Sequence, residues 1–254
     1  MTANINNDSP IALQAVIAIT TLCCCLYGLS ASAKPKEFPY FIATYTANIK
    51  GLSAQASREF KPINGALAEL SFKASSWLAR LEERAQFLWE DQLIQPVRFN
   101  YSRKVMGKTR KRALNFDPQN KTITSTYKDK TYTITNQDEV LDSLSFQLQL
   151  QYDLLEHHLP KANKSKIYRI ADKDQIKQYR IEIVGNELIE TELGSLSTIK
   201  IKVIRENKNR TTYLWLAKKW HNLLVRLEQR KNKKKEFEIQ LTSATVDGKQ
   251  VSGQ

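Results

Sequence analysis

The chain has 254 residues and a formal net charge of +13, from 39 Lys and Arg against 26 Asp and Glu. This length accommodates one or two domains, and the basic balance favours polyanionic partners. The three cysteines are consecutive (Cys23, Cys24 and Cys25) and there are only 8 glycines. This composition excludes a disulfide framework, and no glycine-rich loop that could cradle a phosphate occurs.

An uncharged apolar segment, residues 11–30, comes first and is followed by Ala31, Ser32 and Ala33. Such a run before a small-x-small motif is typical of a secretory signal peptide, so we expect a signal helix in residues 1–33 with cleavage after Ala33. Two alternatives stay open: an uncleaved N-terminal membrane anchor, or lipid attachment at one of the cysteines. The only charged side chain of the segment is Asp8, so its removal leaves a net charge of +14.

All three cysteines lie inside this segment, so the exported chain has no thiol for a metal cluster or a redox pair. A basic protein in the periplasm meets lipid, lipopolysaccharide or cell-wall polymer rather than nucleic acid, and we expect one of these, or an envelope protein, as its partner. The alternative that the charge only aids solubility stays open, because the cations are spread along the chain.

Residues 40–242 alternate apolar and polar side chains, which is typical of half-buried strands. In the segment 66–75, for example, Ala66, Ala68, Leu70, Phe72 and Ala74 share one face. The pattern predicts about a dozen strands joined by short turns, in an antiparallel meander, barrel or sandwich. Turns are expected at Gly107-Lys108, 117–120, Asn186-Glu187 and 207–209, and a flexible tail from about residue 243.

One segment, residues 143–158, alternates almost perfectly but has a composition that favours a helix. Leu, Gln and Glu dominate it, and the acidic residues Asp138, Glu139 and Asp142 precede it. Wound as a helix, it would carry two apolar stripes on nearly opposite sides, one with Leu144 and Leu148 and the other with Phe146 and Leu150. We therefore predict a helix that is buried on both sides, in the hollow of a curved sheet.

Four stretches resemble an exported bacterial family, the domain of unknown function numbered 3108: residues 87–117, 142–155, 183–206 and 211–229. The resemblance implies a β-rich, curved-sheet periplasmic protein without an assigned activity. The last hairpin is also similar to hairpins of periplasmic lipoprotein carriers, which fold as unclosed β-barrels with helices in the hollow. The expected fold is thus mainly β: a curved antiparallel meander or unclosed β-barrel with one central helix, in a single domain over 34–254.

Candidate catalytic groups are few. No nucleophile elbow occurs, and the histidines are His157, His158 and His221. The first two adjoin the end of the predicted helix and the third lies in a predicted turn, so we interpret them as surface residues. We predict no catalytic residue, no metal ligand and no cofactor.

Ligand binding is the favoured function. The aromatic residues expected on the inner face of the sheet are Phe72, Phe87, Trp89, Phe99, Tyr101, Tyr213 and Trp215, and they would either line a cavity or fill the core. The cations expected at its rim are Arg98, Arg103, Lys104, Arg110, Arg112 and Arg226. We predict a non-enzymatic binding or carrier protein for an amphiphilic, anionic envelope component. The first alternative is a structural or assembly factor that contacts protein or polysaccharide, and the second is a hydrolase or glycan-modifying enzyme.

Overall fold

The computed structural model describes residues 38–49, 52–90, 93–159, 165–205, 210–232 and 234–253. The chain divides into Met1–Lys34 and Pro35–Gln254, and every described residue belongs to the second unit. The predicted signal segment with Ala31 and Ala33, and the predicted turn at 207–209, lie outside the described residues.

Sixteen strands form one sheet in the described part of the chain. They are β1 (Phe41–Ile49), β2 (Leu52–Asn64), β3 (Leu67–Ser75), β4 (Ala79–Glu90), β5 (Leu93–Val105), β6 (Lys108–Asp117), β7 (Thr122–Tyr127), β8 (Lys130–Thr135), β9 (Val140–Leu141), β10 (Ser165–Asp172), β11 (Gln175–Thr191), β12 (Gly194–Arg205), β13 (Arg210–Ala217), β14 (Leu223–Lys231), β15 (Lys234–Val246) and β16 (Lys249–Gln250). The helices are α1 (Ser145–Leu155) and the short 3₁₀ helix η1 (Lys218–Trp220).

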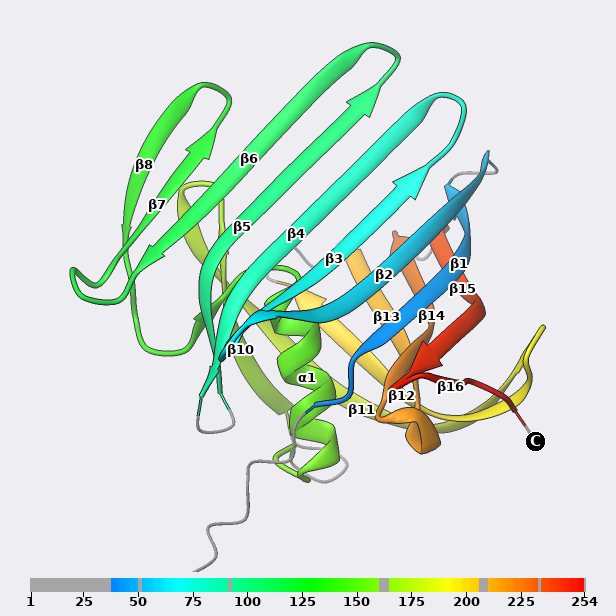
Figure 1. The fold of residues 1–254 in the computed structure, drawn as a ribbon. Coiled ribbons are helices and arrows are strands. Elements are labelled where there is room, and N and C mark those ends of the chain that lie inside the picture. Colours follow the sequence, from blue (N-terminus) through cyan, green and yellow to red (C-terminus); the bar gives the residue numbers. More distant parts are fainter. Residues whose placement is uncertain are drawn as a thin grey trace, which may run out of the picture. The chain divides into compact units, whose positions relative to one another are not determined.

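The sheet is a meander in two halves that meet where β1 pairs with β15. Its order runs from β8 back to β1, then from β15 back to β9, with β16 beside β15. All pairs are antiparallel except β9 with β10. The two ends of the row, β8 and β9, do not pair, so the curved sheet is an unclosed barrel (Figure 1). The predicted mainly β, unclosed fold is confirmed, with more strands than the predicted dozen.

Alternation of side chains decides which face of the first strands is buried. In β1, Phe41, Ala43, Tyr45 and Ala47 are all buried while the residues between them are exposed. The small alanine side chains allow the sheet to curve toward this face, since side chains converge on a concave face. The Tyr45 hydroxyl donates to the Leu224 carbonyl oxygen (3.1 Å) and so ties β1 to β14 across this face.

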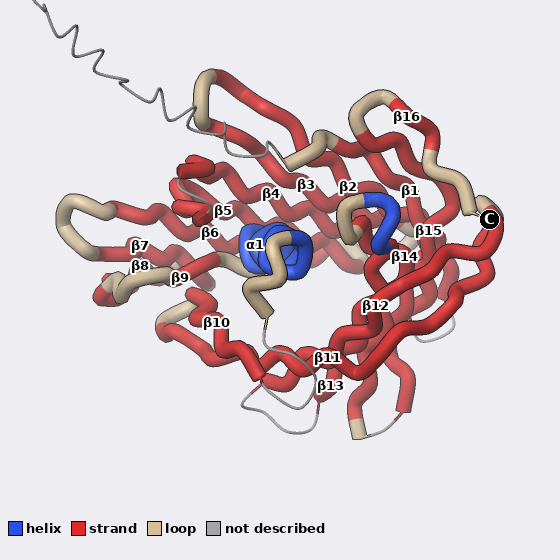
Figure 2. The backbone as a smooth tube through the Cα atoms, turned by 90° about the horizontal axis from the view of Figure 1, so that it is seen from below, coloured by secondary structure: helices blue, strands red, loops and turns tan. Residues whose placement is uncertain are grey.

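The helix α1 lies inside the curve of the sheet, as predicted (Figure 2). Asp142 starts it: its Oδ1 accepts hydrogen bonds from the Leu144 and Ser145 N–H groups (2.8 and 3.0 Å). Both predicted stripes are buried, with Leu144 and Leu148 on one and Phe146 and Leu150 on the other. A helix that is apolar on opposite sides must be packed on both of them, and the interior of the curved sheet provides this packing.

The C-terminal end of α1 is attached to β10 through a buried carboxylate. Asp153 accepts hydrogen bonds from Gln149 Nε2 (3.0 Å), Lys166 Nζ (2.7 Å) and the Tyr168 hydroxyl. Burial, together with the charge of Asp153, raises the pKa of Tyr168 above its ordinary value, so this phenol stays protonated and donates. Asp153 therefore has a structural role: its paired carboxylate holds the end of α1 against β10.

Two sequence predictions are wrong. No flexible tail begins near residue 243, because β15 continues to Val246, β16 pairs back on it and Val251 is buried. No turn occurs at Asn186-Glu187; β11 runs through to Thr191, with only an irregularity of register near Gly185. Among the described residues, no helix has the length and apolar character to cross a membrane.

Truncation of the helix core tests this packing. We expect Leu148→Ala, at a side chain with no exposed surface, to lower the free energy of unfolding by about 2–5 kcal/mol, because a buried cavity is left. Urea unfolding followed by circular dichroism measures it. The control is Ile42→Ala on β1, 56% exposed, with an expected loss within about 0.5 kcal/mol. Equal losses for the two variants would contradict a packed central helix.

Candidate functional site

A row of charged and aromatic residues crosses the concave face of the sheet. In direct register across β2, β3, β4, β5 and β6 lie Arg58, Phe72, Glu83, Tyr101 and Arg112. Directly opposite residues on neighbouring strands project to the same face of a sheet. That face is the concave one, since Glu83 and Arg112 line a cavity together with Phe146 of α1.

This cavity, which we name the hollow, has a volume of about 270 Å³. Its polar lining is Glu83, Arg112, Ser143, Gln147, Asp172, Arg205 and Thr212, and its apolar wall includes Phe146, Ile170, Val203, Leu214 and Leu227. Seven strands of the sheet and the start of α1 thus contribute, so the site forms only in the folded chain.

Arg112 is held in place by one carboxylate and two rings. Its Nη1 donates to Asp172 Oδ1, while its guanidinium carbon lies 5.2 Å and 5.3 Å from the ring centroids of Phe99 and Tyr101. Burial would raise the pKa of Asp172, but the hydrogen bond from Lys177 and the charge of Arg112 outweigh it and lower that pKa. The Nε of Arg112 is buried and has no hydrogen-bond partner among the described residues.

Arg205 repeats this arrangement from β12. Its guanidinium carbon lies 4.9 Å from the ring centroid of Tyr179, and its buried Nε again has no partner among the described residues. The Ser143 hydroxyl, just before α1, is a third such buried group lining the hollow. Three residues that line the hollow therefore each carry one buried polar atom that can donate a hydrogen bond and has no partner in the described part of the chain.

Arg58 is the most deeply buried cation of the row, with 2% of its surface exposed. Its guanidinium carbon lies 5.7 Å from the ring centroid of Phe41, and none of its three nitrogens has a hydrogen-bond partner in the described chain. Burial raises the pKa of the neighbouring Tyr45, an effect that the charge of Arg58 and its side-chain contact with the Tyr45 hydroxyl oppose. A buried guanidinium without a carboxylate partner is costly, because the lost hydration is not replaced.

Glu83 is the carboxylate at the middle of the row. Burial raises its pKa from 4.5 to about 7, and the charge of Asp142 adds to this rise. Arg112, Arg58 and Arg205 oppose it without cancelling it. Glu83 is therefore only partly ionised near neutral pH, and the hollow keeps an excess of positive charge.

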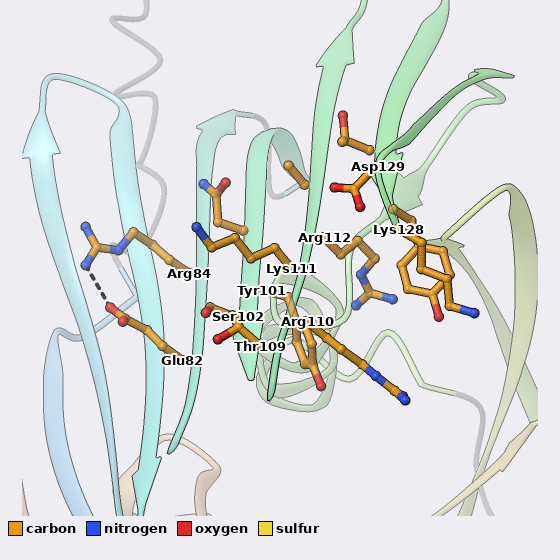
Figure 3. Close-up of a pocket in the computed structure, with 14 residues that line it drawn as sticks. Glu82, Arg84, Tyr101, Ser102, Thr109, Arg110, Lys111, Arg112, Lys128 and Asp129 are labelled. Carbon is orange, nitrogen blue, oxygen red and sulfur yellow. Dashed lines mark hydrogen bonds and ion pairs between the residues drawn. The ribbon is translucent and has the colours of Figure 1, made fainter. Parts of the chain in front are cut away.

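A wider pocket of about 890 Å³ lies beside the β5–β6 hairpin (Figure 3). Most of its lining, including Glu82, Arg84, Asn100, Ser102 and Lys111, projects to the face of the sheet opposite the row of Glu83, Tyr101 and Arg112. Arg112 is common to the linings of this pocket and of the hollow.

Five of the seven predicted aromatic residues lie on the concave face. Phe72, Phe87 and Phe99 are buried in the core there, and Trp89 packs against Tyr152 of α1, with ring centroids 5.1 Å apart. Tyr101 is the one that lines the wider pocket. For most of this group, core packing is the role that the structure gives.

Tyr213 and Trp215 were assigned to the wrong face. They lie opposite Lys202 and Lys200 in register, while Leu214 between them lines the hollow. Trp215 is nevertheless buried; its Nε1 donates to Glu187 Oε2 (2.6 Å) on the far part of β11, and Lys200 and Arg226 lie over its ring. A strand covered on both faces has no polar side, so its alternation could not reveal which face is concave.

The predicted basic rim is divided between the two faces. Arg103, Arg110 and Arg112 share the concave face with Tyr101, whereas Arg98, Lys104 and Arg226 point to the convex side, which corrects their assignment. Arg226 is engaged there with Glu228 (3.1 Å) and Glu238 (2.5 Å), and its guanidinium carbon lies 4.8 Å from the Trp215 ring centroid.

Sequence reasoning missed Arg58, Glu83 and Arg205, although a signal was present. Each occupies a position where the alternation requires an apolar residue: Arg58 follows Ala54 and Ala56 and precedes Phe60. A charged residue at a strand position that alternation assigns to the interior is expected to be buried, and buried charges are rare unless they are paired or functional.

The histidines are not part of the hollow. His158 Nδ1 lies 3.9 Å from Asp153 Oδ1 at the end of α1, and His221 follows η1 with a left-handed φ of 51°. Across the described ranges, no group of three His, Cys, Asp or Glu residues is placed to hold a metal ion.

The fold and the site define a class: a mainly β, unclosed barrel around one helix, with an arginine-lined hollow. Residues 48–247 match the family "Protein of unknown function (DUF3108)", and the chain belongs to this family. No curated protein matches the chain.

Two solved structures are similar at 12% sequence identity. A protein from Bacteroides fragilis described as exported, with a YmcC-like fold, aligns with a TM-score of 0.31 over 82% of this chain and 98% of its own. A protein from Parabacteroides distasonis described as a lipoprotein aligns with a TM-score of 0.32 over 82% of this chain and 97% of its own.

Glu83 should make the stability depend on pH. Its pKa in the folded chain is about 7 against an ordinary 4.5, so the folded state binds the proton more tightly. The corresponding stability is fully present below pH 4.5 and is lost as the pH rises through about 7. We expect Glu83→Gln to gain stability relative to the wild type between about pH 4.5 and pH 8, on the order of 1–3 kcal/mol.

Urea unfolding at both pH values measures this difference. The matched control is Glu82→Gln, because Glu82 is the next residue, projects to the other face and has a side chain that is 44% exposed. A stability difference between Glu83→Gln and wild type that does not change with pH would show that Glu83 is not a buried, proton-binding carboxylate.

Proposed function

We propose that this protein is a non-enzymatic binding protein of the carrier type, and that its ligand is an amphiphilic anion of the cell envelope. The anionic group would bind in the hollow to Arg112 and Arg205, and the apolar part would lie against the wall formed by Phe146 and Leu214. Export of the chain, inferred from residues 1–33, is part of this proposal.

The observation that carries the proposal is the set of buried, unengaged polar groups around the hollow: Arg112 Nε, Arg205 Nε and the Ser143 hydroxyl. Buried polar groups in folded proteins nearly always have partners, because a hydrogen bond contributes about 1 kcal/mol of stability, whereas a buried group left without one costs about 1–3 kcal/mol. An anion with two or more oxygens would supply acceptors for all three and offset the charge of the arginines.

The apolar wall supports an amphiphile over a small inorganic anion. Phe146, Ile170, Val203, Leu214 and Leu227 line the same cavity as the arginines. Binding sites for organic ligands typically combine such apolar walls with a few convergent polar groups. Phosphate or sulfate alone would leave this wall without a function in binding.

Titration calorimetry with dodecyl phosphate, and with dodecyl maltoside as the uncharged comparison, tests the proposal. We expect binding of the phosphate only, weakened at least about tenfold in Arg112→Gln and in Arg205→Gln, since a hydrogen bond to a charged group contributes about 1.5–3 kcal/mol. Circular dichroism checks that the variants fold.

The matched control is Arg98→Gln on the convex face, where the Arg98 Nε donates to Asn115 Oδ1 (3.0 Å); its affinity should be unchanged. Equal binding of both amphiphiles, or equal weakening by all three substitutions, would refute an anion site in the hollow. A protein that binds neither amphiphile would instead favour the assembly-factor alternative.

A further inference from the structure

The two most exposed large hydrophobic side chains in the described chain lie side by side at one end of the sheet. Trp77, in the β3–β4 loop, is 84% exposed, and Met106, in the β5–β6 turn, is 77% exposed. The Met106 N–H donates to the Leu78 carbonyl oxygen (3.1 Å), which joins the two hairpin tips. Both hairpins protrude from the end of the sheet opposite α1 (Figure 1).

The backbone of both hairpin turns has a defined conformation. Ser76 brackets the Trp77 loop, with its N–H donating to the Ala79 oxygen (2.8 Å) and its Oγ accepting from the Ala79 N–H (3.2 Å). Met106 has a left-handed φ of 47°, a position in tight hairpin turns where Asn, Asp or Gly is favoured. Met at this position is disfavoured by the turn and exposed to water, so folding does not explain its presence.

Six exposed cations lie on the same two hairpins, on both faces of the sheet, and we name the whole surface the cationic tip. They are Arg80, Arg103, Lys104, Lys108, Arg110 and Lys111, and the segment 103–111 contains no carboxylate. None of the six forms an ion pair within the described chain. Their positive charge is therefore available to a partner.

Several of these cations also repel each other. Arg103 lies directly opposite Arg110 in register, and Arg80 directly opposite Lys104. Like charges that face each other on neighbouring strands destabilise a sheet. A negatively charged surface at the tip would screen this repulsion, so binding such a partner would lower the electrostatic free energy of the fold.

We propose that the cationic tip docks on an anionic lipid bilayer, with Trp77 and Met106 entering the interface and the six cations on the head groups. Tryptophan partitions to the boundary between head groups and acyl chains, and basic residues beside it are attracted to anionic lipid. The combination of two adjacent apolar wedges with a ring of cations matches a bilayer, which offers both an apolar layer and a charged surface. This inference does not depend on the proposed contents of the hollow.

Tryptophan fluorescence and vesicle co-sedimentation test the docking. Trp77 is the strongly exposed tryptophan of the described chain, since Trp215 is buried and Trp89 and Trp220 are partly buried. We expect vesicles of phosphatidylcholine with phosphatidylglycerol to shift its emission to the blue and to co-sediment the protein. Pure phosphatidylcholine vesicles, or the same anionic vesicles in high salt, should do neither.

Two variants separate insertion from simple charge attraction. Trp77→Ser with Met106→Ser, and Arg103→Gln with Arg110→Gln, should each reduce partitioning at least about tenfold. The control is Leu188→Ser on β11, an apolar side chain that is 60% exposed and distant from the tip in sequence; its partitioning should equal that of the wild type.

Unchanged partitioning in Trp77→Ser with Met106→Ser would overturn the proposal, as would equal binding to neutral vesicles. Binding of the tip to single-stranded nucleic acid but not to anionic vesicles would also overturn it. Trp77→Ser with Met106→Ser, and Leu188→Ser, should still bind dodecyl phosphate as the wild type does, so failure at the tip and failure at the hollow are distinguishable.

Discussion

One short helix cannot fill the concave face of so long a sheet, so part of the interior beside the helix is left to other side chains. α1 buries both of its apolar stripes, but the space beyond its first turn is lined by Arg112, Arg205 and Glu83. Arg58 lies in the same row with its charge buried and unpaired in the described chain. Burial of these charges has a free-energy cost that apolar residues would avoid, which is the physical reason for assigning the hollow a function in binding.

The hollow and the cationic tip are carried by the same hairpin. Arg110 and Arg112 lie two residues apart on the same face of β6, one at the tip and the other in the lining of the hollow. On this account, docking of the tip on a bilayer would bring the hairpin that carries Arg112 to the lipid surface. The two proposals are independent in their evidence but consistent in their geometry.

Much of the fold was predictable, because β1 alternates as half-buried strands do, and because the composition of residues 143–158 favours a helix over the strand that their alternation also fits. Which side chains of β13 face the hollow could not be predicted. Trp215 on the convex face contacts Glu187 of β11 and is buried as deeply as Leu214 on the concave face. The site residues Arg58 and Glu83 were detectable as charges in the buried phase, but their convergence depends on strand pairing that a single sequence does not specify.

The central claim is that the hollow holds an anionic group, and a high-resolution crystal structure of the full-length protein, purified under mild conditions from its native envelope, tests it most directly. The account predicts an anionic group within hydrogen-bond distance of Arg112 Nε and Arg205 Nε, with apolar density against Phe146 and Leu214. A structure in which those two nitrogens and the Ser143 hydroxyl are bound only by water or by protein groups would contradict it.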